Sequence, residues 1–181
     1  IMKIVGPTIV EPWRNVIENA ATLTELEKLR HRMQTYRVLD PACGSGNFLY
    51  VALERLHELE KEVLLLVAEV DEGQFSLDIR VGPHMVKGIE VNPFAQELAQ
   101  VTVWIGHLQW HLKNGFPFVK DPVLKPIETI ECRDAILDLV DPQRPKEALW
   151  PEADVVIGNP PFLGGKRMRT VLGDVYVEAM F

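Results

Sequence analysis

The chain has 181 residues, of which 47% are apolar and 25% are charged, the ordinary balance of a single globular domain. It contains no apolar run long enough to span a membrane, no low-complexity stretch and no internal repeat, which excludes membrane-spanning, disordered and solenoid proteins. Nineteen Lys and Arg residues stand against 26 Asp and Glu, giving a formal net charge of -7. Bulk charge therefore does not attract nucleic acid, and any such contact must be local.

The cysteines and the chain ends indicate the setting of the protein. Cys43 and Cys132 are far apart and no signal-peptide pattern is present, so we expect a reducing cytoplasm rather than a disulfide framework. The chain begins at Ile1 and stops at Phe181 within an apolar helical pattern. We therefore expect a fragment of a longer polypeptide.

The first half of the chain predicts helices, then a strand, a turn and another helix. Residues 9–34 indicate one or two amphipathic helices entered at Pro12. Residues 36–40 form a short β-rich run, followed by turn residues and by a helical pattern from Asn47 onward. Between 61 and 80 the pattern is ambiguous: residues 63–70 fit a buried helix, and 75–81 fit a strand.

The second half continues the alternation of strands and helices. Residues 85–91 predict a strand, and 93–114 a helix with Asn92 as N-cap and Gly115 as C-cap. Apolar residues recur along this helix at helical spacing: Phe94, Leu98, Val101, Ile105, Leu108 and Leu112.

Two further strands are expected at 127–132 and 153–158. The second has no polar alternation and is predicted to be buried on both faces. The alternation predicts an α/β fold with a parallel sheet, whose ligand crevice lies at the carboxyl ends of the strands. The unusual residues all follow strands: Asp40 to Gly46, Glu90, Asp134 and Asn159 to Phe162.

The turn at Asp40-Pro41-Ala42-Cys43-Gly44-Ser45-Gly46 brings backbone amides close to a ligand, because its glycines lack Cβ atoms. Leu49 occupies the third glycine position of a dinucleotide fingerprint, which disfavours a nicotinamide or flavin site. The turn also lacks the Gly-Lys-Ser/Thr ending of a phosphate loop, which excludes that class of site.

Together these motifs resemble class I S-adenosylmethionine-dependent methyltransferases, and more narrowly the adenine-N6 DNA methyltransferases of the gamma arrangement. Residues 88–95, 103–110 and 159–166 resemble the MmeI-like group of restriction-modification proteins. The resemblance implies a Rossmann-like sheet with flanking helices, truncated at its C-terminus. It implies a helical segment at 1–35 that packs on the cofactor site, and a cofactor-binding and catalytic part at 36–181.

The resemblance also implies roles for the strand-end residues. In such a protein the turn wraps the methionine part of S-adenosylmethionine. Glu90 accepts hydrogen bonds from both ribose hydroxyls, and Asp134 lies beside the adenine amine. The alternative role for Asp134 is a helix N-cap, and the two roles are compatible. The cofactor residues implied are Thr8, Asp40, Pro41, Ala42, Cys43, Gly44, Gly46, Asn47, Phe48, Glu90, Val91, Asp134, Ala135 and Asn159.

Asn159-Pro160-Pro161-Phe162 corresponds to the catalytic loop in this resemblance. An exocyclic amine is a poor nucleophile because its lone pair is delocalised into the ring. If the Asn159 side-chain oxygen and the Pro160 carbonyl each accept one N6 hydrogen, the lone pair is directed toward the methyl group, and positioning supplies the catalysis. Phe162 offers a face for a flipped adenine of double-stranded DNA, and Pro161 completes the loop.

Other charged residues give weaker indications. Lys166, Arg167 and Arg169 follow this loop and suit a DNA phosphate, or simply form a solvated basic helix start. His107 and His111 stand four residues apart, but without a third ligand we expect no metal site.

Three functions remain open. The first is site-specific DNA adenine-N6 methylation, with a target-recognition domain, and with or without a nuclease domain, elsewhere in the parent chain. The second is methylation of RNA adenine or of a protein glutamine, since the same loop serves those planar amines. The third is a cofactor-binding fragment without activity.

Overall fold

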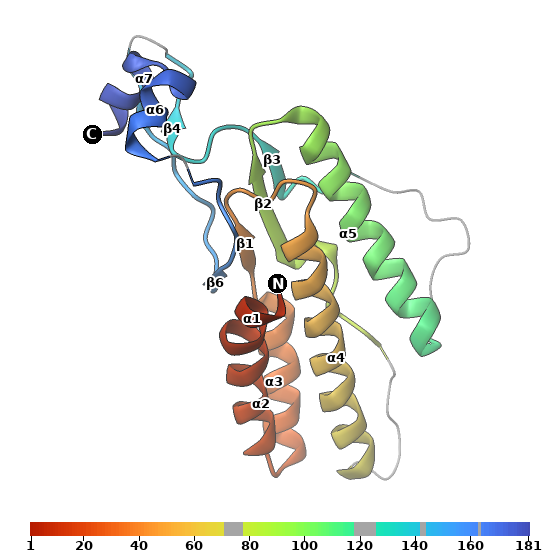
Figure 1. Cartoon of the computed structure of the whole chain (residues 1–181). Helices are drawn as coiled ribbons and strands as arrows, with labels where there is room; N and C mark the ends of the chain where they lie inside the picture. Colours follow the sequence, from red (N-terminus) through yellow and green to blue (C-terminus); the bar gives the residue numbers. More distant parts are fainter. Residues whose placement is uncertain (71–77, 118–125, 142–143, 163) are drawn as a thin grey trace.

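The protein, seen in a computed structural model, is described for residues 1–70, 78–117, 126–141, 144–162 and 164–181 (Figure 1). The described residues form a four-stranded parallel sheet in the order β3-β2-β1-β6. Its strands are β1 (Val38–Asp40), β2 (Val86–Glu90), β3 (Ile130–Cys132) and β6 (Val155–Val156). The predicted α/β class with a parallel sheet is confirmed.

The first 35 residues are helical, as expected, but the helical backbone starts earlier than Pro12. It runs through α1 (Met2–Val5), the π-helical η1 (Gly6–Val10), α2 (Glu11–Glu18) and α3 (Leu23–Thr35). Helix α3 begins with a capping box, in which Thr22 Oγ1 accepts a hydrogen bond from the Glu25 amide at 3.3 Å and the Glu25 carboxylate accepts one from the Thr22 amide at 3.0 Å. Trp13, Met33 and Leu49 belong to one continuous hydrophobic core, so these helices pack directly on α4.

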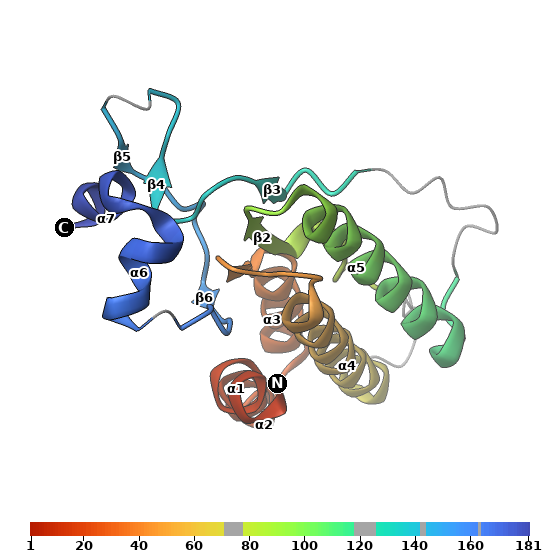
Figure 2. The same ribbon diagram turned by 45° about the horizontal axis from the view of Figure 1, so that its top comes forward.

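Helices α4 (Asn47–Val70) and α5 (Pro93–Asn114) pack side by side on the same face of the sheet (Figure 2). The helix predicted at residues 63–70 is confirmed as the continuation of α4. Of the alternative strand at 75–81, residues 75–77 lie outside the described part and 78–81 form no strand. A short 3-10 turn, η2 (Pro83–Met85), leads into β2.

Helix α5 is capped as predicted but turns an unexpected face inward. Asn92 Oδ1 accepts hydrogen bonds from the amides of Phe94 and Ala95, and Gly115 is left-handed at φ +72°. The apolar stripe is largely outside: Phe94, Leu98, Val101, Ile105 and Leu112 are 42 to 75% exposed. The buried face is instead made by Ala99, Val103, Gly106, Trp110 and His111.

Close approach of the helices explains this choice. A Cβ on Gly106 would lie 2.2 Å from the Tyr50 ring of α4, so only a glycine lets α4 and α5 come this near.

The expectation that the strand at 153–158 is buried on both faces was wrong. Only Val155–Val156 pair with β1, and Val156 is 49% exposed. Among the described strands β6 stands at the edge of the sheet, next to β1 alone, so one side of it has no partner strand there. The Asp154 carboxylate accepts a hydrogen bond from the Arg37 amide at 2.7 Å, which fixes the register with the start of β1.

The C-terminal elements lie beyond the carboxyl ends of the strands (Figure 1). They comprise an antiparallel pair, β4 (Leu137–Asp138) and β5 (Lys146–Glu147), and two helices, α6 (Gly165–Leu172) and α7 (Asp174–Met180). The β4–β5 pair was not predicted. No helix in the described ranges is both long and apolar enough to cross a membrane.

Candidate functional site

The strand order reverses at the carboxyl end of β1, where sheets of this kind have their ligand crevice. The chain passes from β1 to β2 and β3 on one side, and later adds β6 on the other side of β1. This reversal makes the end of β1 a topological switch point, the usual ligand site of such sheets. Asp40 ends β1, Glu90 ends β2, and Asn159 follows β6.

Asp40 is a buried carboxylate in the middle of this crevice. It is 1% exposed, and its Oδ1 accepts a hydrogen bond from the Ala42 amide at 3.1 Å. Burial raises the pKa of Asp40 to about 6; the Ala42 amide opposes the shift and the nearby Glu90 adds to it. A Cβ on Gly158 would lie 2.6 Å from Asp40 Oδ1, so the segment leading to Asn159 passes directly against this carboxylate.

The glycine turn after Asp40 is shaped by two left-handed residues. Gly44 has φ +53° and Gly46 has φ +80°. A Cβ on Gly46 would press on the Ala99 backbone of α5 at 3.0 Å, whereas a Cβ on Gly44 would meet no atom within 4 Å. Gly46 thus serves packing, and Gly44 leaves its backbone open to a ligand.

Glu90 ties the ends of β1 and β2 together. Its Oε2 accepts a hydrogen bond from the Gly44 amide at 2.9 Å, and its Oε1 accepts one from the Asn92 amide at 2.8 Å. The Cys43 amide donates to the Ile89 carbonyl at 3.1 Å. The predicted gathering of the Asp40 turn and Glu90 is therefore present.

Asp134 follows β3 and organises the loop behind it. Its Oδ1 accepts hydrogen bonds from the amides of Ile136 at 2.7 Å and Leu137 at 3.1 Å, and no helix begins there. The alternative of a helix N-cap is therefore wrong, because the carboxylate caps a turn instead. Its Oδ2 accepts a hydrogen bond from the Tyr176 hydroxyl of α7 at 2.7 Å, and burial together with this carboxylate raises the pKa of Tyr176.

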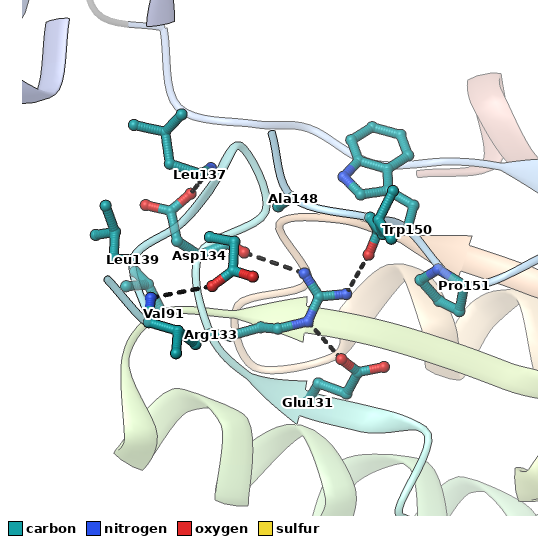
Figure 3. Close-up of a pocket in the computed structure, with 12 residues that line it drawn as sticks. Val91, Glu131, Arg133, Asp134, Leu137, Leu139, Ala148, Trp150 and Pro151 are labelled. Carbon is teal, nitrogen blue, oxygen red and sulfur yellow. Dashed lines mark hydrogen bonds and ion pairs between the residues drawn. The ribbon is translucent and has the colours of Figure 1, made fainter. Parts of the chain in front are cut away.

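A cavity of about 790 Å³ lies beside Asp134 (Figure 3). Val91, Asp134, Leu139, Leu149 and Trp150 are among the residues that line it. It starts one residue beyond Glu90, at the same edge of the sheet as the Asp40 turn.

Arg133 and Trp150 brace the wall of this cavity, and sequence reasoning missed both. Arg133 is paired with Glu131 and donates hydrogen bonds to the carbonyls of Leu149 at 2.9 Å and Asp134 at 3.2 Å (Figure 3). Trp150 Nε1 donates to the Ala135 carbonyl at 2.6 Å. The Trp150–Ala135 and Arg133–Leu149 contacts span 15 and 16 residues of sequence, and no local pattern predicts them.

The loop Asn159–Phe162 is open to solvent. Phe162 is 90% exposed, and within the described part of the chain the Asn159 side chain makes no hydrogen bond. The loop is thus placed beside Asp40 through Gly158, with its polar and aromatic groups free to meet a ligand.

The other predicted contacts are less closely associated with the crevice. Thr8 is exposed, and its hydroxyl donates to the Ile4 carbonyl of its own helical segment at 2.7 Å. Arg169 pairs with Asp174 at 3.2 Å and Glu178 at 3.8 Å. Arg167 is exposed on α6, and Lys166 lies in the same helix.

The sequence matches a known family over most of its length. The model of the MmeI DNA-methyltransferase domain matches residues 15–173. The chain belongs to the MmeI DNA-methyltransferase domain family. The resemblance to the MmeI-like group, which rested on residues 88–95, 103–110 and 159–166, is confirmed.

Two curated relatives agree with this assignment. This methyltransferase domain is 32% identical over 175 residues to DNA methyltransferase A of Bacillus subtilis (strain 168), covering 93% of this chain and 20% of that protein. It is 33% identical over 127 residues to a putative type II restriction enzyme and methyltransferase of Methanocaldococcus jannaschii, covering 67% of this chain and 10% of that protein. The chain therefore spans a fifth or less of the length of these relatives.

A solved structure supports the fold. The Type IIL restriction-modification enzyme MmeI, determined in complex with DNA, superposes with a TM-score of 0.55 at 24% sequence identity, over 67% of this chain and 17% of that chain. The fold that the family resemblance implied is thereby confirmed.

The crevice suits a cationic nucleoside cofactor of a methyltransferase. Asp40 is buried among few compensating donors, as its raised pKa indicates, and a nearby positive charge would relieve that penalty. Gly44 leaves room for a ligand against its backbone, and Glu90 presents a carboxylate that can accept from paired hydroxyls. The residues present therefore fit S-adenosylmethionine.

Proposed function

We propose that residues 36–181 are the cofactor-binding and catalytic part of a DNA adenine-N6 methyltransferase that uses S-adenosylmethionine, with the helical segment of residues 1–35 packed on α4 and on the cofactor site. The observation that carries the proposal is the Asn159-Pro160-Pro161-Phe162 loop, exposed at the switch point and held against Asp40 by Gly158. Membership of a DNA-methyltransferase family makes a methyl donor the cofactor this crevice serves.

The strand ends would bind the cofactor in three parts. Asp40 and the amides of the glycine turn face its methionine end, with the neighbouring Pro41, Ala42, Cys43, Asn47 and Phe48 shaping that end. Glu90, whose carboxylate now accepts hydrogen bonds from the Gly44 and Asn92 amides, would accept hydrogen bonds from the ribose hydroxyls. Val91 and Asp134, which line the cavity of Figure 3, would flank the adenine together with Ala135, the residue after Asp134. When bound, S-adenosylmethionine supplies an electrophilic methyl group on a sulfonium.

The Asn159 loop would bind the acceptor. The Asn159 side-chain oxygen and the Pro160 carbonyl accept the two N6 hydrogens of adenine, which localises the amine lone pair for in-line attack. Phe162 stacks on the base once it has left the duplex. No thiolate is required, and burial raises the pKa of the neighbouring Cys43 thiol to about 12, which keeps it uncharged.

DNA contacts by this part of the protein would be local. The formal charge of -7 opposes binding through the whole surface. Arg167 on α6 is the better phosphate ligand, because Arg169 is already paired with two carboxylates of α7. Recognition of the target sequence then belongs to other segments of the protein, as does any nuclease.

The test is methyl transfer by the protein with its natural flanking sequence. Radiolabelled S-adenosylmethionine is incubated with duplex DNA, RNA and a protein extract, and the labelled products are hydrolysed to nucleosides or amino acids. We expect label in N6-methyladenine of DNA. Label in RNA adenine or in glutamine would refute the DNA assignment while keeping the site, and absence of transfer to all three would refute the enzymatic proposal.

A further inference from the structure

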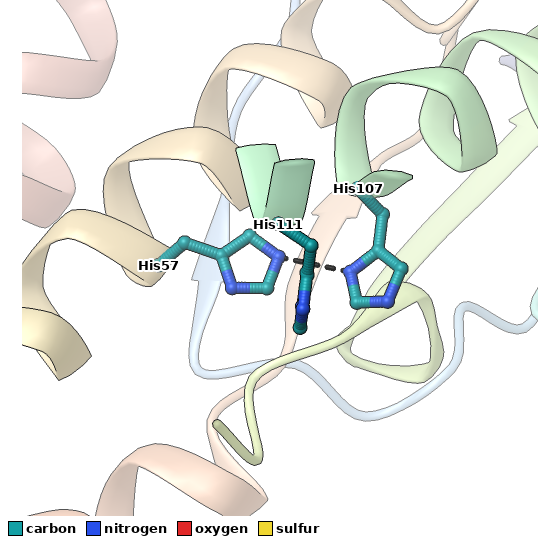
Figure 4. A group of neighbouring side chains, drawn as sticks. All are labelled: His57, His107 and His111. Atoms are coloured by element: carbon teal, nitrogen blue, oxygen red, sulfur yellow. Dashed lines mark hydrogen bonds between the residues drawn. The ribbon is translucent and has the colours of Figure 1, made fainter. Parts of the chain in front are cut away.

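Three histidines meet between α4 and α5, away from the carboxyl edge of the sheet. His57 comes from α4, and His107 and His111 from successive turns of α5, all pointing into one space (Figure 4). One ring nitrogen from each lies within 4.8 Å of the others, and His57 Nε2 is 3.0 Å from His107 Nδ1. The reason given for expecting no metal site, the lack of a third ligand, was therefore wrong.

The ring nitrogens of this cluster, His57, His107 and His111, are poorly satisfied. His57 and His111 are buried, and among the described residues His57 Nδ1 and both ring nitrogens of His111 have no hydrogen-bond partner. The Pro117 backbone lies near enough to His111 to favour its charged form slightly, without reaching hydrogen-bond geometry. An unsatisfied buried polar atom costs about 1–3 kcal/mol, so such a set of imidazoles calls for a ligand.

Burial also lowers the pKa values of the three histidines. Burial, followed by repulsion from the other two histidines, lowers the pKa of His57 to about 2. Burial, with His111 and His84 nearby, lowers the pKa of His107 to about 4, and burial lowers that of His111 as well. Burial thus favours the neutral form of these rings, and a neutral imidazole has a lone pair that can ligate a metal ion.

A purely structural explanation covers only part of the cluster. The His57–His107 hydrogen bond and the stacking of His57 on Trp110, with ring centroids 4.5 Å apart, account for two of the rings. They leave His111 without a polar partner in the described part of the chain, although it contacts both other histidines through its ring. A shared ion satisfies one nitrogen of every ring at once.

We propose that His57, His107 and His111 bind a divalent transition-metal ion, zinc being the expected one, that clamps α4 to α5. Histidines four residues apart on one helix present both rings to the same side, and a third ligand from a neighbouring helix completes a three-nitrogen set with water as the fourth ligand. Tetrahedral coordination at about 2.0–2.1 Å separates ligand nitrogens by roughly 3.3 Å, a value close to the 3.0 Å contact, so His111 has only to turn inward.

The position of the site indicates a structural role. His57 lies ten residues into α4, about 15 Å of helix from the glycine turn, and His107 lies further along α5 from Glu90. The ion would therefore contact neither cofactor nor acceptor. It would fix α4, which begins directly after the glycine turn, against α5, which begins at the Asn92 cap.

The experiment measures zinc binding by the whole protein, purified through an affinity tag that contains no histidine. The chelator-treated protein is titrated with Zn²⁺ by calorimetry, and its thermal unfolding is followed with and without the ion. Co²⁺ is used as a second probe, because a tetrahedral nitrogen site gives visible d–d absorption. His107→Gln is the test variant, since His107 is only half-buried, and His31→Gln, at an exposed position of α3, is the matched control.

We expect binding of one equivalent of Zn²⁺ with a rise in Tm, retained in His31→Gln and weakened at least about tenfold in His107→Gln. If His107→Gln fails to fold, His111→Gln serves the same comparison. Absence of zinc binding by the wild-type protein, or equal affinity in wild type and His107→Gln, would overturn the proposal.

Discussion

Replacing Asp40 by asparagine is expected to stabilise the fold and impair its function. The pKa of Asp40 is raised from 3.8 to about 6 because the ionised carboxylate is buried. A shift of about two pKa units corresponds to about 3 kcal/mol. Below the unfolded pKa the folded state bears no penalty, and above pH 6 it bears all of it, so stability falls as pH rises between these values.

Asparagine keeps an oxygen that can accept the Ala42 amide but carries no charge. We expect Asp40→Asn to be more stable than wild type by up to about 3 kcal/mol near pH 8, with little difference near pH 4. Its affinity for S-adenosylmethionine should fall by about tenfold or more, because a charge-assisted contact is lost.

Hydrogen exchange at the amides of Val38–Asp40 in the whole protein reports the local free energy of unfolding, and calorimetry reports cofactor affinity. Wild type and variant are compared at each pH, with Glu97→Gln at an exposed site of α5 as the charge-matched control. Equal stability of Asp40→Asn and wild type near pH 8, or a difference that does not change with pH, would refute the reasoning.

Two further predictions concern the same crevice. Gly158→Ala would bring a Cβ to 2.6 Å from Asp40 Oδ1, and overpacking of this kind destabilises the native arrangement by about 1–3 kcal/mol. We expect calorimetry to show a loss of roughly 5- to 150-fold in cofactor affinity. Unchanged affinity would show that the two segments are not in contact. Burial raises the pKa of the Cys43 thiol to about 12, whereas Cys132 is exposed. We therefore expect iodoacetamide at neutral pH to label Cys132 well before Cys43, as followed by mass spectrometry. Equal labelling rates would contradict a buried, uncharged Cys43 thiol.

Local signals predicted the elements that build the site. The Asn92 cap and Gly115 define α5 at both ends, and the glycine turn after Asp40 separates β1 from α4 as expected. These features depend on residues adjacent in sequence, where backbone preference and side-chain capping decide the conformation. Parallel strands then bring their carboxyl ends to one edge, which places Asp40 and Glu90 together.

The wrong predictions concern which side chains are buried, because tertiary packing decides that. The apolar stripe of α5 suggests one face, but Gly106 opposite Tyr50 lets a different face approach α4 more closely. Val156 is apolar and yet half-exposed, although its strand pairs with β1. Apolar spacing along one element carries no information about what covers it.

Contacts distant in sequence were also beyond prediction. His57 meets His107 across 50 residues, and Tyr176 meets Asp134 across 42. Both contacts follow from how whole helices pack, so no motif around either residue indicates them.

The most direct test of the central claim separates cofactor binding from methyl transfer at Asn159. The protein and its Asn159→Ala variant are compared for S-adenosylmethionine affinity by calorimetry and for N6-methyladenine formed in duplex DNA by nucleoside analysis. We expect the variant to bind the cofactor within a few-fold of wild type and to form no detectable N6-methyladenine, because the acceptor amine has lost its oriented oxygen. Transfer that survives in Asn159→Ala would contradict the assignment of this loop as the catalytic one.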